Sequence, residues 1–520
     1  MMLFKIFFSL LLGGLFISLA CLYYVLWLGP ERNRERLRRQ GIRGPPPCFP
    51  YGNMLEMERY CTQSTEKKPP DDQEGNSFSH NYAPMLFPYF ERWRKSYGPI
   101  FMYSLRNVLI LYVSDPDLVK EIGLSTSLDL GKPSHLQQDH KPLFGLGILR
   151  SNGRSWYHQR KIIAPEFFMD KVKGMLDLMV ESTIPILKSW ESKIDVDSEV
   201  GEIRVDEELR NFSADVISRA CFGSSYSKGR EIFLRLRALQ YAMHKAGLFT
   251  GITGLRHIPT QRNRHIWKLD KEIRSLILGI VKEEKGGGYK GRCEKGLLTA
   301  ILEAASLNLQ DGPDAATRFI VDNCKNIYFA GYETTAVTAT WCLMLLALNP
   351  GWQARVRTEV LDICRGRTPD ADMIRRMKTL TMVIQETLRL YPPSTFVPRE
   401  ALQEMKIGGI QLPKGINLWI SVPTLHQDPQ IWGPDASQFN PERFARGIIG
   451  ACKLPQVYIP FGIGPRTCLG QNFAMMEMKV LLSIILSKFT FSLSPNYSHS
   501  PAYRMVVEPQ HGLYLLIKRL

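Results

Sequence analysis

The chain has 520 residues, a formal net charge of +16 and an ordinary hydrophobic fraction of 44%. Such a composition allows a large buried core, and neither a repeat period nor a long low-complexity linker divides the chain. No single basic stripe interleaves with aromatic residues, which argues against nucleic-acid binding. Anionic lipid and an acidic protein partner are better candidates to meet the positive charge.

Residues 6–28 form 23 consecutive positions without a charged side chain. About 20 apolar residues cross a bilayer as a helix, so we predict a transmembrane anchor here. A cleaved signal peptide is the alternative, because Ala20 resembles a cleavage site. The apolar run continues past that site through Trp27 and Leu28, which favours an uncleaved anchor.

Residues 29–50 are interpreted as a basic linker followed by a proline-rich hinge. Six arginines and only two glutamates lie between positions 31 and 43. The positive-inside rule then places the N-terminus in the lumen and the rest of the chain in the cytosol, as a single-pass protein of the endoplasmic reticulum membrane in a eukaryotic cell. A merely solvated charge run would explain the arginines but not their position beside the span. The prolines at 45–47 stiffen the connection.

Residues 51–520 are predicted to form one large domain, in which helical patterns dominate between about 155 and 390. The polar stretch 61–80 is interpreted as an exposed loop, and the glycines at 286–288 interrupt the helical part. Short strands are expected within 102–113, and a small strand pair within 406–418. The predicted fold is therefore mainly α with a minor β part. The ten cysteines are scattered without a C-x-x-C pair, so neither disulfides nor zinc is expected.

Trp156 and Arg160 have the W-x-x-x-R spacing, which places both side chains on one face of a helix. An indole N–H and a guanidinium can each donate hydrogen bonds to a carboxylate. Taken alone, such a pair is more often a packed aromatic residue beside a surface charge.

Glu333 and Thr334 follow Gly331 within a long apolar helix predicted for about 319–348. Gly331 costs about 1 kcal/mol relative to alanine in a helix interior. A helix tolerates that cost where something flat approaches its backbone or where it must open. The acid and the hydroxyl together can relay protons through water. The alternative is a threonine whose hydroxyl bonds back to its own helix.

Glu386 and Arg389 are three residues apart, so a helix presents both on one face. Alone this spacing is a weak signal, because most such pairs are exposed and contribute little. Here the neighbours are apolar, and Arg443 lies downstream. A carboxylate paired with two arginines can persist in a protein interior, because buried charges must be paired.

Residues 461–470 carry the most specific pattern of the chain, with Cys468 in a glycine-punctuated loop and Arg466 two positions before it. Glycines permit backbone turns that a Cβ would block. Backbone N–H groups of such a loop can stabilise a thiolate. A buried structural cysteine in a glycine-rich loop is the alternative.

The pattern F-x-x-G-x-R-x-C-x-G at 461–470 resembles the haem-binding signature of the cytochrome P450 superfamily. The other three motifs appear in the order that this family requires, so the resemblance covers most of the chain. It implies the cytochrome P450 fold after one transmembrane helix, haem b with Cys468 as the axial thiolate, proton delivery by Glu333 and Thr334, and a structural triad of Glu386, Arg389 and Arg443. The haem contacts that it implies are Trp156, Arg160, Arg399, Phe461, Arg466 and Gly470.

The implied activity is that of a haem-thiolate monooxygenase, in which thiolate ligation favours O–O cleavage. No nucleotide-binding signature is present, so electrons would come from NADPH through a separate flavoprotein reductase, and the enzyme is expected to be a monomer. Candidate docking residues are 160–161, 365–367, 375–376 and 378, although scattered solvated charges explain them equally well. A haem sensor or carrier would not need Glu333 and Thr334, and a haem-thiolate isomerase or dehydratase often lacks the threonine.

Substrate recognition is placed by the resemblance in five stretches, at about 122–150, about 235–260, the helix around 329, 394–397 and 511–513. The candidate contacts are Phe329, Ala330, Phe396, Val397 and Leu513, which would form an apolar lining. The stretches 163–168, 329–335, 341–347 and 507–512 resemble a plant group of the 72 clan that includes gibberellin and ent-kaurenoic acid hydroxylases and oxidases of pentacyclic triterpenoid acids. A rigid polycyclic terpenoid is therefore expected, with Lys132, His140 or Lys141 near its carboxylate. A steroid or a fatty acid is the alternative.

Overall fold

The computed structural model describes residues 2–66, 80–195, 197, 199–223, 226–244, 258–285, 296–307 and 312–520. The exposed loop expected at 61–80 is wrong at 61–66, because these residues form the end of a helix, and 67–79 lie outside the described residues. The glycines at 286–288 and residues 245–257 of the recognition stretch 235–260 also lie outside them. The chain divides into two compact units. The first comprises Met1–Gly75, Tyr82–Pro133 and Phe396–Leu425, and the second comprises Asn76–Asn81, Ser134–Thr395 and His426–Leu520.

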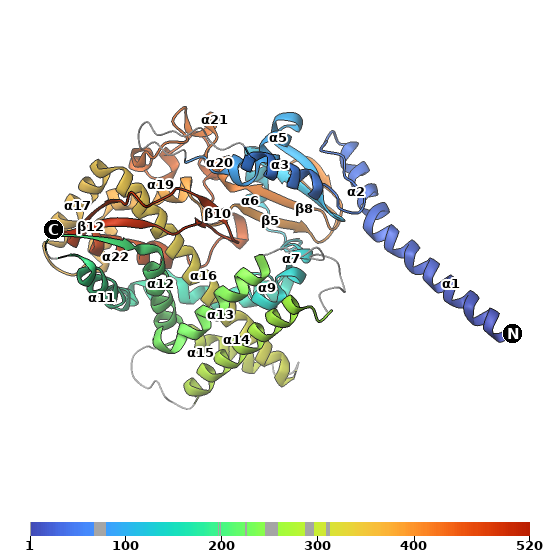
Figure 1. Ribbon diagram of the computed structural model, residues 1–520, viewed down its shortest axis with the longest axis horizontal. Helices are drawn as coiled ribbons and strands as arrows, with labels where there is room; N and C mark the ends of the chain where they lie inside the picture. The colour runs from blue at the N-terminus through green and yellow to red at the C-terminus, as the bar shows by residue number, and fades with distance from the viewer. Residues whose placement is uncertain are drawn as a thin grey trace. The chain divides into compact units, whose positions relative to one another are not determined.

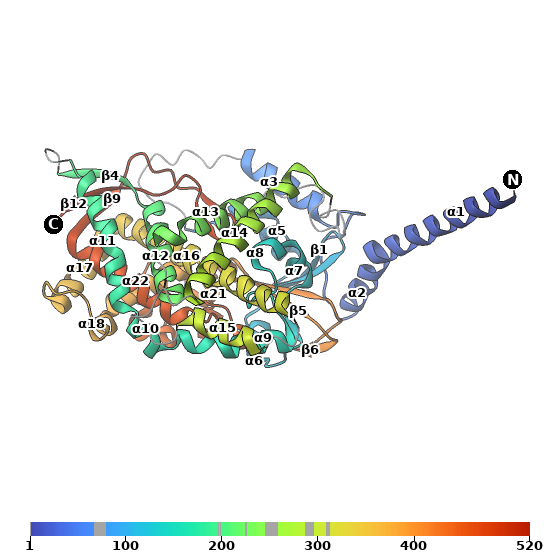
Figure 2. The same cartoon turned by 90° about the horizontal axis from the view of Figure 1, so that it is seen from below.

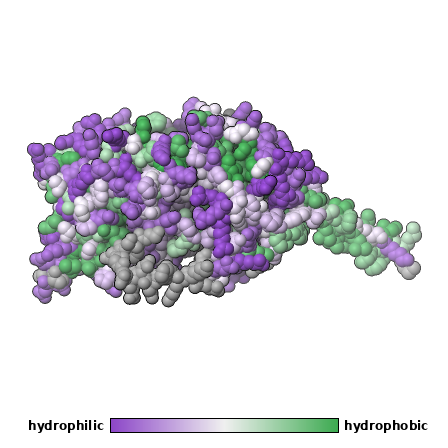
Figure 3. Space-filling model, turned by 90° about the horizontal axis from the view of Figure 1, so that it is seen from above, coloured by the Kyte–Doolittle hydropathy of each residue, from purple (hydrophilic) through white to green (hydrophobic). Residues whose placement is uncertain are grey.

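The N-terminal segment of the first unit is one continuous helical run, in which the apolar α1 (Met2–Tyr23) and the π-helical turn η1 (Tyr24–Leu28) are followed by the charged α2 (Gly29–Arg38). The described side chains of α1 are exposed all round, and Figure 3 shows its surface coloured as hydrophobic along most of its length. An exposed helix that is apolar on every side has lipid as its natural surroundings. Within the described residues, this run is the one helix long and apolar enough to cross a membrane.

The arginines after the anchor lie largely on α2, so the basic part of the predicted linker is helical. Arg34 is buried, forms an ion pair with Glu31 and donates from Nη2 to the hydroxyl of Ser104 at 2.6 Å. Arg36 binds Glu404 at 2.6 Å. These contacts tie α2 to the rest of the first unit.

A five-stranded sheet with the order β1-β2-β8-β5-β3 forms the centre of the first unit (Figure 1). An aromatic cluster packs against it. The ring centres of Phe101 and Tyr112 are stacked at 4.5 Å, and the Phe90 ring of the helix α5 (Pro88–Tyr97) lies 5.0 Å from that of Tyr112. The expected strands within 102–113 are confirmed as β1 and β2. The strand pair expected within 406–418 is confirmed as β6 and β7. The strands are β1 (Ile100–Leu105), β2 (Val108–Val113), β3 (Leu130–Gly131), β5 (Phe396–Ala401), β6 (Met405–Ile407), β7 (Ile410–Leu412) and β8 (Asn417–Ser421).

Short helices complete the first unit. Asp115 caps α6 by accepting a hydrogen bond from the Leu118 N–H at 2.8 Å, which satisfies one of the unpaired donors at a helix start. These helices are α3 (Met54–Glu66), α4 (Ala83–Leu86), α5 (Pro88–Tyr97) and α6 (Pro116–Leu124), and α20 (Val422–His426) follows β8.

The second unit is mainly helical and is organised around α16 (Pro313–Leu348), along which α12 (Val205–Phe222) packs (Figure 2). Pro313 starts α16 where a missing N–H costs nothing, and Pro350 begins the next helix directly after it. The helix predicted for 319–348 is therefore confirmed. The remaining helices are α7 (Ser134–Asp139), α8 (Lys141–Phe144), α9 (Gly153–Ile163), α10 (Met169–Gly174), α11 (Leu176–Lys193), α13 (Tyr226–His244), α14 (Gln261–Lys285), α15 (Leu297–Leu307), α17 (Pro350–Cys364), α18 (Ala371–Arg376), α19 (Lys378–Leu390), α21 (Pro429–Trp432) and α22 (Gln471–Lys488).

Two small antiparallel sheets belong to the second unit. One has the order β4-β12-β9, and the other pairs β10 with β11. Their strands are β4 (Val200–Arg204), β9 (Phe489–Leu493), β10 (Pro501–Tyr503), β11 (Val507–Pro509) and β12 (Tyr514–Arg519). The architecture is therefore mainly α with a minor β part, as predicted.

Candidate functional site

The cysteine loop is closed by backbone hydrogen bonds in the segment before α22. The N–H of Cys468 donates to the carbonyl of Phe461 at 2.8 Å, and the N–H of Thr467 donates to that of Gly464 at 3.0 Å. Gly462 and Gly464 have φ angles of 78° and 70°, a left-handed conformation that side chains with a Cβ rarely adopt. The two glycines therefore allow the turn that presents Cys468.

The Cys468 side chain is accessible to solvent, although many other residues surround it. Burial raises the pKa of its thiol, while a hydrogen bond from the Gly470 backbone and the positive charge of Arg160 oppose that rise. A metal ion that binds such a sulfur deprotonates it outright. The loop therefore offers an accessible sulfur with one N–H donor and one cation beside it.

Two arginines connect this loop to α9. Arg160 donates from Nη1 to the carbonyl of Thr467 at 3.0 Å, and Arg466 donates to the carbonyl of Ser151 at 3.1 Å. The guanidinium of Arg466 lies 4.2 Å from the centre of the Trp156 ring, and that of Arg160 lies 5.6 Å from it. The structure brings Trp156, Arg160 and Arg466 together beside Cys468, and confirms that the first two share a helix face.

The family model that describes cytochrome P450 matches residues 74–517. The chain belongs to the cytochrome P450 family. It is 54% identical over 503 residues to cytochrome P450 714C2 of Oryza sativa subsp. japonica, covering 96% of this chain and 95% of that protein. It is 52% identical to cytochrome P450 714B3 of Zea mays (96% and 93% covered) and 49% identical to cytochrome P450 714A2 of Arabidopsis thaliana (94% and 93% covered). The protein is therefore a haem-thiolate monooxygenase, and family membership implies lipophilic substrates and electrons from a redox partner.

The residues around Cys468 fit a haem. The sulfur is accessible, and Trp156, Arg160 and Arg466 supply N–H donors of the kind that bind propionates. Phe461 and Gly470 frame the cysteine through their backbones, as described above. Arg399 lies on β5 in the first unit, where burial lowers the pKa of its guanidinium to about 10.

Thr334 on α16 bonds back to its own helix. The hydroxyl of Thr334 donates to the carbonyl of Ala330 at 2.7 Å, which is the local back-bond anticipated as the alternative. That hydrogen bond leaves the hydroxyl oxygen able to accept another donor. Close packing against α12 explains the glycine at position 331, because a Cβ there would lie 2.5 Å from Cδ1 of Ile217.

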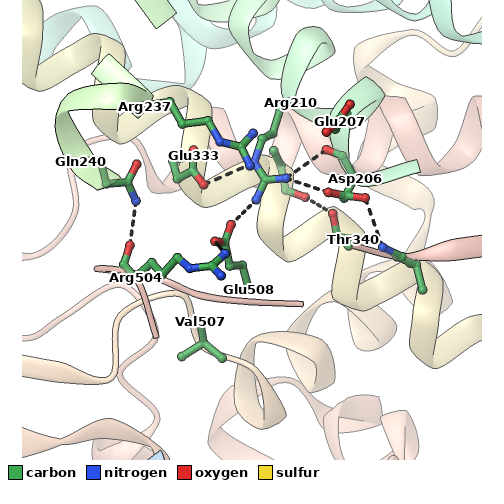
Figure 4. A network of polar contacts seen from close by, with 12 residues as sticks. Asp206, Glu207, Arg210, Arg237, Gln240, Glu333, Thr340, Arg504, Val507 and Glu508 are labelled. Carbon is green, nitrogen blue, oxygen red and sulfur yellow. Dashed lines mark hydrogen bonds and ion pairs between the residues drawn. The ribbon is translucent and has the colours of Figure 1, made fainter. Parts of the chain in front are cut away.

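Glu333 belongs to a buried ionic network that the sequence did not reveal (Figure 4). Arg210 of α12 lies 3.3 Å from Glu333 and 3.0 Å from Asp206, and its Nη2 also binds Glu508 of β11. Burial lowers the pKa of Arg210, but the charges of Glu333 and Glu508 more than offset this effect and raise it. Arg504 binds Glu508 at 2.7 Å.

The predicted triad is present as a buried cluster. Glu386 and Arg389 have no exposed side-chain surface and are 2.7 Å apart, and Arg443 lies 3.5 Å from Glu386. Arg389 also donates to the carbonyls of three residues that precede the cysteine loop, namely His426 at 2.8 Å, Ala436 at 2.6 Å and Gln438 at 3.0 Å. Sequence reasoning missed Asp435, which binds Arg443 at 2.5 Å. The cluster therefore holds the segment that leads to Cys468.

The predicted substrate contacts are distributed over both units. Phe396 and Val397 lie on β5 of the first unit, whereas Phe329 and Ala330 lie on α16 of the second. Leu513 has no accessible surface, and its N–H donates to Asp206 at 3.1 Å. Lys141 is exposed, and Lys132 belongs to the first unit. His140 contacts Arg150, a residue that sequence reasoning missed.

Proposed function

We propose that this cytochrome P450 hydroxylates a rigid polycyclic terpenoid, either a diterpenoid such as a gibberellin or ent-kaurenoic acid, or a pentacyclic triterpenoid acid. The reaction would consume O2 and electrons that a flavoprotein reductase takes from NADPH. The observation that carries the proposal is the apolar ring pair Phe144–Phe329, at 5.1 Å, one helical turn before Glu333 on α16. Stiff aromatic surface of this kind suits a stiff hydrocarbon skeleton.

The bound haem would supply the oxygen-activating chemistry, and the Cys468 thiolate would bind its iron. The chain's own residues would position the substrate, exclude water and move protons. Glu333 and Thr334 would deliver protons, because an acid and a hydroxyl are adjacent on α16. The cofactor would be held by Trp156, Arg160, Arg399, Phe461, Arg466 and Gly470. The segment that leads to Cys468 would be kept in place by Glu386, Arg389 and Arg443.

We place residues 6–28 in the membrane of the endoplasmic reticulum with the N-terminus in the lumen. Residues 29–50 would then connect the anchor to a cytosolic catalytic domain at 51–520. The support is the apolar surface of α1 followed by the arginines of α2. Protease treatment of intact microsomes tests this topology, because a tag on the C-terminus should be digested and a tag on the N-terminus should be protected.

The reductase would dock on the basic residues around α18. Arg365, Arg367, Arg375, Arg376 and Lys378 are exposed, and Lys479 of α22 donates to the carbonyl of Ile374 at 3.2 Å, which ties α18 to the helix that follows Cys468. Reversing Arg375 and Arg376 to glutamate should slow reduction of the haem, more at low salt than at high salt. Reversal of Arg519, exposed on β12, is the matched control.

Microsomes that contain this chain and a plant reductase test the substrate assignment. They should convert one of a panel of diterpenoid and triterpenoid acids to an alcohol when NADPH is present, and mass spectrometry and NMR should locate the new hydroxyl. With 18O2 the product should carry one heavy oxygen atom. Products without label would indicate isomerisation instead, and turnover of only steroids or fatty acids would contradict the terpenoid assignment.

A further inference from the structure

Arg150 is a buried cation just before α9. The residue is only 9% exposed to solvent. Its Nη2 contacts Nδ1 of His140, and its guanidinium lies 5.1 Å from the centre of the Phe144 ring. Among the described residues no carboxylate lies within 4.0 Å of it, and Asp139 acts on it only as a more distant charge.

This situation differs from that of the other deeply buried arginines of the second unit. Arg210 binds three carboxylates and Arg389 binds Glu386, as charges taken out of water require. Arg150 has a histidine and an aromatic face instead. Burial lowers the pKa of its guanidinium to about 10, a value at which it still carries its charge at neutral pH.

Two histidines line the same place. Both ring nitrogens of His135 are buried and have no hydrogen-bond partner within the described chain. Burial, followed by the charge of Arg150, lowers the pKa of His135 to about 4 and that of His140 to about 3. Both rings are therefore neutral at physiological pH, and each can donate one N–H. Arg150 supplies the positive charge of the group.

The segment that carries Arg150 is fixed on α16. The N–H groups of Leu146, Ile148 and Leu149 donate to the side chains of Asp322, Asn323 and Asn326 at 2.8, 3.1 and 2.8 Å. Gly145 and Gly147 permit this approach, because a Cβ would lie 2.0 Å from the Asp322 side chain at the first and 2.6 Å from that of Asn326 at the second. A group held in this way is preorganised for a ligand.

The cation lies beside the part of α16 that carries the oxidation chemistry. Phe144, under the guanidinium, makes an edge contact with Phe329, and Phe329 lies one turn, roughly 6 Å, before Glu333. Arg150 also interacts electrostatically with Tyr503 of β10. A molecule lying on the two phenylalanines would thus have a charged end near Arg150 and its carbon skeleton near Glu333 and Thr334.

We propose that Arg150, with N–H donors from His135 and His140, is the receptor for the substrate's carboxylate, and that it decides which end of the substrate points away from the haem. The inference rests on the proposed function and narrows it to organic acids with a rigid apolar body. Charge-assisted hydrogen bonds from a buried arginine discriminate strongly between an acid and its neutral ester. A haem propionate is a second source of the same chemical group, and the experiment separates the two.

The test uses the haem-loaded full chain in detergent or lipid nanodiscs. Two probe pairs are titrated at pH 7.5, ent-kaurenoic acid with its methyl ester and dodecanoic acid with its methyl ester, and the substrate-induced shift of the Soret band gives each Kd. In the unmodified protein each acid that binds should bind roughly tenfold to a hundredfold more tightly than its ester. Arg150→Gln should remove that preference without changing haem content, and Arg150→Lys should keep part of it. Arg154→Gln is the matched control, because Arg154 is exposed four positions further on.

Equal binding of acid and ester by the unmodified protein would overturn the inference without any variant being needed, and so would the absence of a shift with both acids. Loss of haem from Arg150→Gln would assign the arginine to a propionate instead. The proposed function fails separately, when no terpenoid of the panel is oxidised. In that case the dodecanoic acid pair still reports whether Arg150 binds a carboxylate.

Discussion

Arg210 Nε lies 3.3 Å from Oε1 of Glu333, so the acid of the helix that carries Thr334 is held by an arginine from α12. The same guanidinium binds Asp206 and Glu508, which places three carboxylates around one cation in the protein interior. Glu333 is therefore an ion-paired acid next to Thr334 in the sequence. Its position is fixed by a network that reaches the exposed side of the unit through Arg204, which is 3.0 Å from Asp206.

Replacing Arg210 with methionine should destabilise the protein strongly, by about 3–5 kcal/mol, because buried carboxylates would lose their shared counter-ion. Chemical denaturation of the holoprotein measures the loss. Arg237→Met is the control, since Arg237 is only half-buried and donates to Tyr241 at 3.2 Å. Similar stability of the two variants would show that the network contributes little to folding.

Thr334→Ala should uncouple electron use from product formation, so that peroxide rises and product per NADPH falls. The hydroxyl is the group beside Glu333 that can accept and pass a proton, whereas its back-bond to Ala330 is dispensable for the helix. Thr338→Ala removes an equivalent back-bond, at 2.8 Å to the carbonyl of Thr334, one turn further along. The coupling ratio of the control should stay normal. Equal coupling in both variants would exclude proton delivery by Thr334.

Contacts within a single helix could be predicted from the spacing of residues in the sequence. Trp156 and Arg160, or Glu386 and Arg389, meet because helix geometry alone brings such positions together. The approach of Arg210 to Glu333 and Glu508 could not be predicted in this way, because these residues are 123 and 298 positions apart and no local pattern links them. The close packing that requires glycine at position 331 could not be predicted from the sequence, because it involves Ile217 of another helix. The burial of Arg150 could not be predicted either, because it depends on the hydrogen bonds that fix residues 145–149 on α16.

Arg443→Ala should abolish haem incorporation. It leaves Glu386 in a fully buried site with one fewer counter-ion and also releases Asp435, a loss of about 3–5 kcal/mol for a buried pair. The matched control is Arg355→Ala, because Arg355 binds Glu442, the direct neighbour of Arg443, in a half-exposed pair at 2.7 Å. That pair should contribute no more than about 1 kcal/mol. Haem content per protein distinguishes the two, and a fully loaded Arg443→Ala protein would contradict the structural role.

Cys468→Ser should remove the red-shifted Soret band that thiolate ligation gives the reduced, carbon-monoxide-treated protein. A serine hydroxyl is a much poorer ligand for the iron than a thiolate. Cys452→Ser is the control, because Cys452 is a partly buried free cysteine before the loop. Its spectrum should be unchanged. A red-shifted band that survives in Cys468→Ser but disappears in Cys452→Ser would move the ligand assignment to the other cysteine.

Glu477 on α22, the helix that follows Cys468, should make the protein less stable as the pH rises. Burial raises the pKa of its carboxyl from 4.5 to about 8, and the nearby Ser213 hydroxyl offsets only part of that rise. Between these two values the folded chain keeps a proton that the unfolded chain has lost, so stability falls with increasing pH by up to about 1.4 kcal/mol per pH unit. Above about pH 9 both states are deprotonated and the decline from this group ends.

Glu477→Gln keeps the shape of the neutral acid and should remove this dependence. The variant should therefore gain stability relative to the unmodified protein, by about 2 kcal/mol, as the pH is raised from 6 to 8. The difference should then change by only about 0.4 kcal/mol from pH 8 to 9. Denaturant unfolding of the holoprotein at each pH measures the difference. Glu191→Gln, at an exposed position on α11, is the control and should follow the unmodified protein. A constant difference between Glu477→Gln and the unmodified protein from pH 6 to 9 would mean that Glu477 does not titrate in this range.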